Sequence, residues 1–173
     1  LSKHNIGQVD HVLKMAREMG FLATFQVLHH NELIGCNTGL HATDAEVREV
    51  ARMLLARKRE GWPVASSVEY LKLWATWPNY QVNRLQSRAG YPTCRSGRLY
   101  CNVDVDGSMY PCSLFVDEMD NPPNVRELGF MGAFKTLEIP DCNACLATCF
   151  TEYNLLYSLN ISTGLNWVKA LIK

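Results

Sequence analysis

The stretch that decides the fold is CNVDVDGSMYPC, residues 101–112. Apolar residues flank its Asp106-Gly107 pair, and an Asp-Gly pair in that setting is one of the strongest short-range signals for a β-hairpin. We therefore expect a hairpin with Cys112 at its end.

The hairpin is part of a longer cysteine pattern. Six of the seven cysteines fall between Cys94 and Cys149, with the spacing C-x6-C-x10-C-x29-C-x2-C-x3-C. Four thiolates can close a tetrahedral Zn²⁺ site or hold the irons of a cluster. A zinc ribbon pairs two C-x2-C knuckles, whereas this chain has one, from Cys142 to Cys145. The spacing favours an iron-sulfur site and leaves zinc, unligated thiols and disulfides as alternatives.

Composition limits the class of protein. The chain has 173 residues, 47% of them hydrophobic and 20% charged, which suits one domain or one and a half. Its net charge is zero and no block of like charge stands out, so we expect neither a nucleic acid nor a membrane as partner. The odd number of cysteines and the lack of a signal-peptide pattern lead us to expect a cytoplasmic location, where disulfides are disfavoured.

The cysteine region resembles the C-terminal SPASM or twitch region of radical S-adenosylmethionine (radical SAM) enzymes. The resemblance rests on Cys94 and Gly97, on the Asp-Gly and Pro-Cys elements that end at Cys112, and on the later C-x2-C knuckle. It covers about a third of the chain. In that family these elements hold an auxiliary [4Fe-4S] cluster that transfers electrons or positions the substrate.

The resemblance also implies a ligand set. The expected ligands are Cys94, Cys112, Cys142 and Cys145, and the alternatives are Cys101 and Cys149. Two-cluster members of the family use a further cysteine after the knuckle region, and nothing after Cys149 is a cysteine. We therefore expect one cluster.

The N-terminal part is similar to a late step of the radical SAM partial barrel. Apolar spacing predicts a helix over 9–19 that ends at Gly20, followed by a strand over 21–28 buried on both faces. Capping boxes predict helices from Thr43 to about Glu60 and from Ser66 to about Trp77. Tyr70, Trp74 and Trp77 are predicted core residues.

The rest of the chain is predicted to be a polar connector over 79–91, and helices over 126–137, 150–159 and 162–172. The first of these helices is expected to pack Phe130 and Phe134. The predicted fold class is α/β: the C-terminal portion of a partial (β/α) barrel at residues 1–85, then a small α+β iron-sulfur domain with a β-hairpin at 86–173.

Four polar residues follow the predicted strand: His29, His30, Asn31 and Glu32. In a barrel, the C-terminal ends of the strands carry the active site, so these residues are candidates for a pocket. The alternative is an ordinary polar loop. Cys36 stands apart from the other cysteines and is expected to be a buried or incidental thiol.

One element of the family is missing. The loop that binds the S-adenosylmethionine-cleaving cluster has the pattern C-x3-C-x2-C, and no such triplet precedes Cys94. The resemblance therefore implies a C-terminal fragment that is catalytically incomplete alone, and its catalytic residues are unknown. It would bind S-adenosylmethionine only with an N-terminal barrel portion as partner, and would act on a peptide or a small metabolite. The alternative function is a zinc-binding protein-interaction module.

Overall fold

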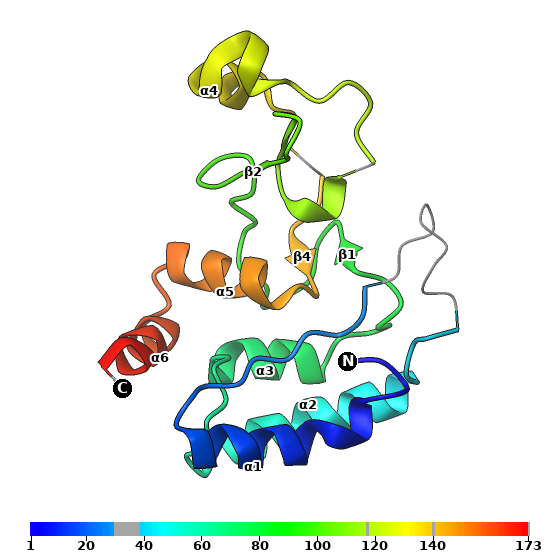
Figure 1. Ribbon diagram of the computed structural model, residues 1–173, viewed down its shortest axis with the longest axis vertical. Helices are drawn as coiled ribbons and strands as arrows, with labels where there is room; N and C mark the ends of the chain where they lie inside the picture. Colours follow the sequence, from blue (N-terminus) through cyan, green and yellow to red (C-terminus); the bar gives the residue numbers. More distant parts are fainter. Residues whose placement is uncertain (30–38, 117, 140, 173) are drawn as a thin grey trace. The chain divides into compact units, whose positions relative to one another are not determined.

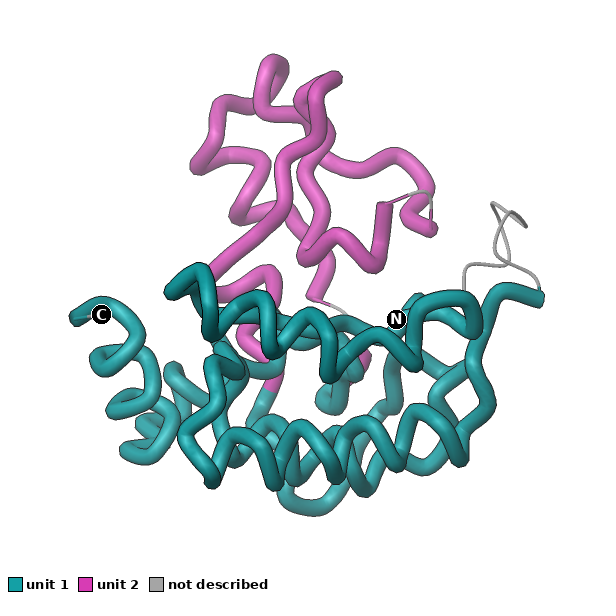
Figure 2. The backbone as a smooth tube through the Cα atoms, turned by 60° about the horizontal axis from the view of Figure 1, so that its bottom comes forward, with its two compact units in different colours: residues 1–93, 143–173 teal, residues 94–142 magenta. Residues whose placement is uncertain are grey.

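The computed structural model describes residues 1–29, 39–116, 118–139 and 141–172. Within these ranges the chain is a mixed α/β protein with six α-helices and two small antiparallel sheets (Figure 1). It divides into two compact units (Figure 2): unit 1 is residues 1–93 and 143–173, and unit 2 is residues 94–142. Each unit is described by itself. The predicted functional domains at 1–85 and 86–173 stay a prediction.

Unit 1 contains most of the helices. Its elements are α1 (Val9–Met19), α2 (Asp44–Arg59), α3 (Val68–Ala75), β1 (Arg84–Leu85), β4 (Ala144–Cys145), α5 (Thr148–Tyr157) and α6 (Ile161–Ile172). Unit 2 holds β2 (Asn102–Val103), β3 (Met109–Tyr110) and α4 (Val125–Thr136). No helix in the described part of the chain is both long and apolar enough to cross a membrane.

Helix α1 ends, and helix α2 begins, where the sequence predicts. Gly20 follows α1 with φ 76°, a left-handed conformation that glycine adopts without strain, and its N–H donates to the Ala16 carbonyl. Thr43 and Glu46 form the predicted capping box at the start of α2. The hydrogen bonds from Thr43 lower the pKa of the Glu46 carboxyl.

The two extended segments on either side of α2 run parallel. Ala23 N–H donates to the Pro63 carbonyl, and Ala65 N–H donates to the Ala23 carbonyl, each over 2.8 Å. The bridge between Ala23 and Val64 is a single one rather than a strand pair, so the barrel stays a prediction. Residues 21–28 are not buried on both faces as expected. Burial alternates, with Phe25 and Val27 in the core and Thr24 exposed, because only one face of this segment packs on the helices.

Helix α3 begins one residue later than predicted, with Ser67 as the N-cap rather than Ser66. The Ser67 hydroxyl accepts the Tyr70 N–H at 3.1 Å. The Ser67 N–H donates to Glu152 Oε1 at 2.6 Å, and Glu152 is 85 residues away on α5. The reciprocal acid of this cap therefore comes from a distant helix, which no local sequence pattern reveals. The helix also ends at Ala75, short of Trp77.

The aromatic core extends further than predicted. Tyr70, Trp74 and Trp77 are fully buried, as expected, and Tyr80 joins them at 1% exposure. The Tyr80 hydroxyl donates to the Trp74 carbonyl at 2.8 Å. Residues 79–91 are thus not simply a polar connector, since they contribute a core aromatic and the strand β1, which pairs antiparallel with β4.

Unit 2 contains the predicted hairpin. Strands β2 and β3 pair with Asn102 opposite Tyr110, and Asp104 N–H closes the turn on the Ser108 carbonyl at 2.9 Å. Gly107 has φ 90°, and a Cβ at this position would lie 2.7 Å from Asn124 Oδ1. Glycine is therefore needed in this turn for its conformation and for its lack of a side chain.

Helix α4 is bent at Gly129, whose φ of 66° is not helical. Its Phe130 and Phe134 rings stack with centroids 6.1 Å apart, but Phe130 stays 55% exposed. Only Phe134 packs against the small core of the unit, so the prediction that both rings are packed is wrong for Phe130. The buried part of that core consists of Met109, Ala133 and Leu137.

We predict that Glu152 makes folding stability depend on pH. Burial raises the pKa of its carboxyl above the ordinary value of 4.5, so the folded state holds a proton that the unfolded state has lost. Stability therefore falls as pH rises from 4.5 through the folded pKa. In Glu152→Gln the amide oxygen can still accept the Ser67 N–H, but this pH dependence is lost. Urea unfolding across this pH range measures the difference.

The control is Glu49→Gln, because Glu49 is an exposed carboxylate on α2. Its stability should follow that of the wild type at every pH. If the free energies of unfolding of the wild type and of Glu152→Gln differed by the same amount at every pH, the prediction would be contradicted.

Candidate functional site

The hairpin of unit 2 places two cysteines at its open end. Cys101 directly precedes β2, and Cys112 follows β3 after Pro111. The Cys112 side chain is buried, with 6% exposure. Cys101 is half-buried against the small core, and burial raises the pKa of its thiol.

The loop after Cys94 is fixed to the same end of the hairpin. Ser96 Oγ donates to the carbonyl of Pro111 at 2.6 Å, next to Cys112. Cys94 Sγ lies 3.9 Å from the Tyr100 hydroxyl, and Gly97 N–H closes the loop on the Tyr100 carbonyl at 2.8 Å. Within unit 2, the backbone of residues 94–97 is therefore tied to the residue that precedes Cys112.

Gly97 is required by this loop for two reasons. Its φ is 69°, and a Cβ would lie 2.9 Å from Ile139 Cδ1. The glycine on which the family resemblance partly rests is thus explained by local packing.

The C-x2-C knuckle leads from Cys142, the last residue of unit 2, into β4 of unit 1. The knuckle backbone is held by several other segments. Leu146 N–H donates to the Asn83 carbonyl at 2.9 Å, and the Thr151 hydroxyl donates to the Cys145 carbonyl at 2.7 Å. The buried Tyr70 hydroxyl donates to the Leu146 carbonyl at 3.0 Å, and burial raises its pKa well above the ordinary value. These bonds fix the backbone that carries Cys145.

The Cys145 sulfur accepts a backbone hydrogen bond. Ala147 N–H lies 3.3 Å from Cys145 Sγ, and both residues are buried. The Cys145 sulfur therefore has a fixed backbone donor two residues further along the chain. Hydrogen bonds to sulfur are also one of the means by which proteins set the potential of an iron-sulfur cluster.

One of the four predicted pocket residues is described by the structure. His29 Nε2 lies 2.7 Å from Gln26 Nε2, and Gln26 Oε1 accepts the Thr148 N–H at 2.7 Å. Burial lowers the pKa of His29, so the neutral ring can accept the Gln26 amide proton. Gln26 therefore connects His29 to the start of α5, three residues after Cys145. Gln26 lies inside an apolar run, so no sequence pattern marks it as a site residue.

The other predicted residues of the N-terminal part cannot be placed in this way. His30, Asn31, Glu32 and Cys36 lie outside the described residues.

The predicted thiol ligands belong to different units. Cys94, Cys101, Cys112 and Cys142 are in unit 2, whereas Cys145 and Cys149 are in unit 1, and all six are thiols rather than disulfides. Among the described residues, no group of three or more His, Cys, Asp or Glu side chains is arranged to hold a metal ion. The chemical type of these residues does fit an iron-sulfur cluster, because thiols are soft ligands and one of the sulfurs has a backbone donor. The ligand set stays a prediction.

Comparison of the chain with protein-family models, with curated proteins and with solved structures finds no match. The resemblance to radical SAM enzymes therefore rests on the residues alone, namely the cysteine motif and the helix and strand pattern of the N-terminal part.

We predict that Tyr70→Phe destabilises unit 1 by about 1–3 kcal/mol. The change removes the hydroxyl between the Leu146 carbonyl and Thr148 Oγ1, and Leu146 is fully buried, so its carbonyl would lose a partner that water cannot replace. Urea unfolding followed by far-UV circular dichroism measures the loss. The matched control is Tyr157→Phe, since Tyr157 is 43% exposed. It should change stability by less than about 0.5 kcal/mol, and equal effects of the two changes would argue against a special role for Tyr70.

Proposed function

We propose that this chain is the C-terminal part of a radical SAM enzyme and binds one auxiliary [4Fe-4S] cluster. The observation that carries the proposal is the knuckle at Cys145. Its sulfur accepts the Ala147 N–H, and its backbone is held by Asn83, Thr151 and Tyr70. A cysteine held in this way keeps its sulfur in one place, as a metal ligand must.

The proposed ligands are Cys94, Cys112, Cys142 and Cys145, and Cys101 and Cys149 are the alternatives. Four thiolates would complete the cluster and leave no iron open to substrate. The cluster would then act in electron transfer or hold the parts of the site in position, rather than bind the substrate through an iron.

The thin core of unit 2 supports a resident metal group. Its buried apolar residues are Met109, Ala133 and Leu137. Domains shorter than about 70 residues usually need disulfides, a metal or close partners to be stable. The cysteines of this unit are thiols, so a metal group is the natural source of the missing stability.

The fold supports the N-terminal part of the proposal in outline. Two parallel extended segments joined through α2 are what a late step of a partial (β/α) barrel contains. The cluster that cleaves S-adenosylmethionine would belong to an N-terminal barrel portion that carries the C-x3-C-x2-C loop. The substrate would be a peptide or a small metabolite, and a reducing cytoplasm would keep the thiols available.

The direct test compares single cysteine variants after anaerobic reconstitution with iron and sulfide. We predict that Cys112→Ala lowers bound iron at least fivefold and lowers the thermal stability of the region from about residue 91 onward, because a proposed ligand at the end of the hairpin is removed. Cys36→Ala is the control, because Cys36 lies outside the proposed ligand set, and it should keep the iron content of the wild type.

Iron, sulfide and zinc analysis with a visible absorption spectrum gives the readout. Unchanged iron and unchanged melting in Cys112→Ala would remove this cysteine from the ligand set. Colourless protein with one zinc per chain would replace the cluster by the alternative function, a zinc-binding protein-interaction module.

A further inference from the structure

One face of α6 in unit 1 is apolar and exposed. Four large side chains on it are exposed by 78, 55, 52 and 79% of their surface, in the order Ile161, Leu165, Val168 and Ile172. At 3.6 residues per turn these four fall within about 60° around the helix axis. They therefore form one continuous stripe, and we call these four residues the α6 seam. Leu171 lies beside the seam and is 83% exposed.

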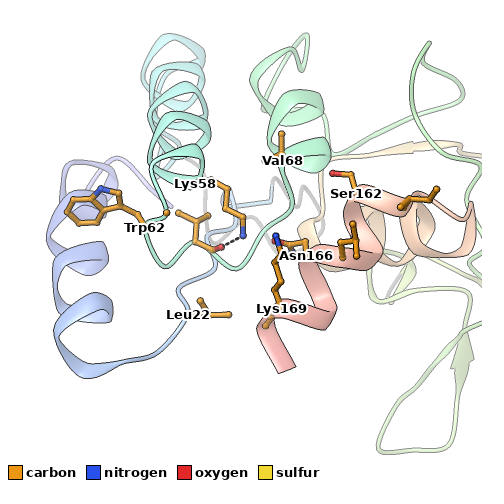
Figure 3. Close-up of a pocket in the computed structure, with 12 residues that line it drawn as sticks. Leu22, Lys58, Trp62, Val68, Ser162, Asn166 and Lys169 are labelled. Atoms are coloured by element: carbon orange, nitrogen blue, oxygen red, sulfur yellow. Dashed lines mark hydrogen bonds between the residues drawn. The ribbon is translucent and has the colours of Figure 1, made fainter. Parts of the chain in front are cut away.

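Other faces of α6 hold the helix on unit 1. Thr163 is fully buried, and Asn166 Nδ2 donates to the Ala65 carbonyl at 3.0 Å. Figure 3 shows Asn166 and Lys169 on the side of α6 that faces Lys58 of α2, where the helix lines a cavity of about 600 Å³. Within the described residues, these contacts leave more than half of each seam side chain exposed.

The seam lacks the charges that an outer helix face usually carries. Lys169 is the one charged residue in the sequence of α6, and it lies outside the seam. A helix face that stays in water is normally polar or charged, whereas the core of a protein interface is depleted of charged residues. The composition of the seam is therefore that of an interface core.

The spacing of the seam indicates that its partner is a second helix. Its residues are separated by four, three and four positions, which is the spacing of the apolar positions in a coiled coil. This spacing is the same when it is read from either end. In an antiparallel pair of α6 helices, Ile161 would lie opposite Ile172 of the partner subunit, and Leu165 opposite Val168 of the partner subunit. The seam is thus complementary to itself about a two-fold axis, as the interface of a symmetric dimer must be.

A glycine beside the seam also fits a close helix partner. Gly164 lies in the middle of α6, where glycine is unfavourable for the helix. A Cβ at this position would meet nothing within 4 Å, so packing among the described residues does not require glycine. The distance between two packed helices depends on the side chains at their contact, and glycine permits a short one.

The exposed area is sufficient for a weak dimer. If a fully buried Ile, Leu or Val side chain removes about 100 Å² of apolar surface from water, the seam and Leu171 offer about 350 Å² per copy. Homodimer interfaces are about 65% apolar, so the whole interface would bury about 1,000 Å² over both copies. This area is near the lower limit for a specific interface. We therefore expect a dimer that dissociates on dilution.

We propose that two copies of this chain dimerise through antiparallel packing of their α6 helices, with the α6 seam at the centre of the interface. No cysteine takes part, so the dimer does not depend on the proposed cluster.

The test is sedimentation velocity of the full chain over a wide range of concentrations, with a reductant present to prevent disulfides between copies. We expect monomers at low concentration and dimers at high concentration. Val168→Glu should weaken the association at least tenfold, because it places a carboxylate from each copy in the apolar centre of the interface. The matched control is Val105→Glu, since Val105 is 91% exposed in the hairpin of unit 2. It should dimerise like the wild type.

A pair of opposite charges tests the antiparallel arrangement. Leu165→Glu and Val168→Lys should each weaken self-association, whereas an equal mixture of the two variants should form a mixed dimer. The reason is that the new carboxylate at position 165 would lie opposite the new ammonium group at position 168 of the other copy. Circular dichroism checks that each variant is folded.

Monomers at every concentration would overturn the proposal and leave the N-terminal barrel portion as the candidate partner of this face. Equal dimerisation of Val168→Glu and Val105→Glu would overturn it as well. A mixture of Leu165→Glu and Val168→Lys that associates no better than either variant alone would overturn the antiparallel arrangement.

Discussion

Unit 1 depends on the hydrogen bonds that hold the backbone of residues 143–148. The carbonyls of Leu85 in β1 and of Asn83 just before it accept N–H groups of this stretch. The side chains of Tyr70 in α3 and of Gln26 in the first extended segment also bond to it. Each of these groups is far from residue 145 in sequence, so the stretch joins elements that local propensity alone would not bring together. Because residues 144–148 are buried, removing a partner from one of their backbone groups leaves a polar atom that water cannot reach, at a cost of about 1–3 kcal/mol.

The same network gives Cys145 its chemical setting. Its sulfur accepts the Ala147 N–H, and the backbone on either side of the sulfur is hydrogen-bonded to other segments of unit 1. The fixed knuckle contrasts with unit 2, where the core is small and the hairpin cysteines are thiols.

The sequence was informative where the cause of a structure is local. Gly20 and the Thr43 capping box end and begin helices through contacts within one turn, and the Asp106-Gly107 turn forms the hairpin through its own backbone. The sequence was uninformative where a structure depends on residues far away in the chain. The cap of α3 uses Glu152 of α5, Tyr80 is buried through tertiary packing, and the one-sided burial of residues 21–28 follows from which helices cover them. For the candidate site, the cysteine pattern predicts Cys145 as a ligand, whereas the hydrogen bonds that Gln26 and Tyr70 make to residues 146–148 appear only in the folded structure.

The central claim is that these thiols hold iron and sulfide rather than zinc. The most direct measurement is the visible absorption spectrum of the wild-type chain, with iron, sulfide and zinc analysis, after anaerobic preparation with all three offered together. The account predicts a brown protein with about four irons and four sulfides per chain and little zinc. A colourless protein with one tightly bound zinc, or with no metal at all, would contradict it.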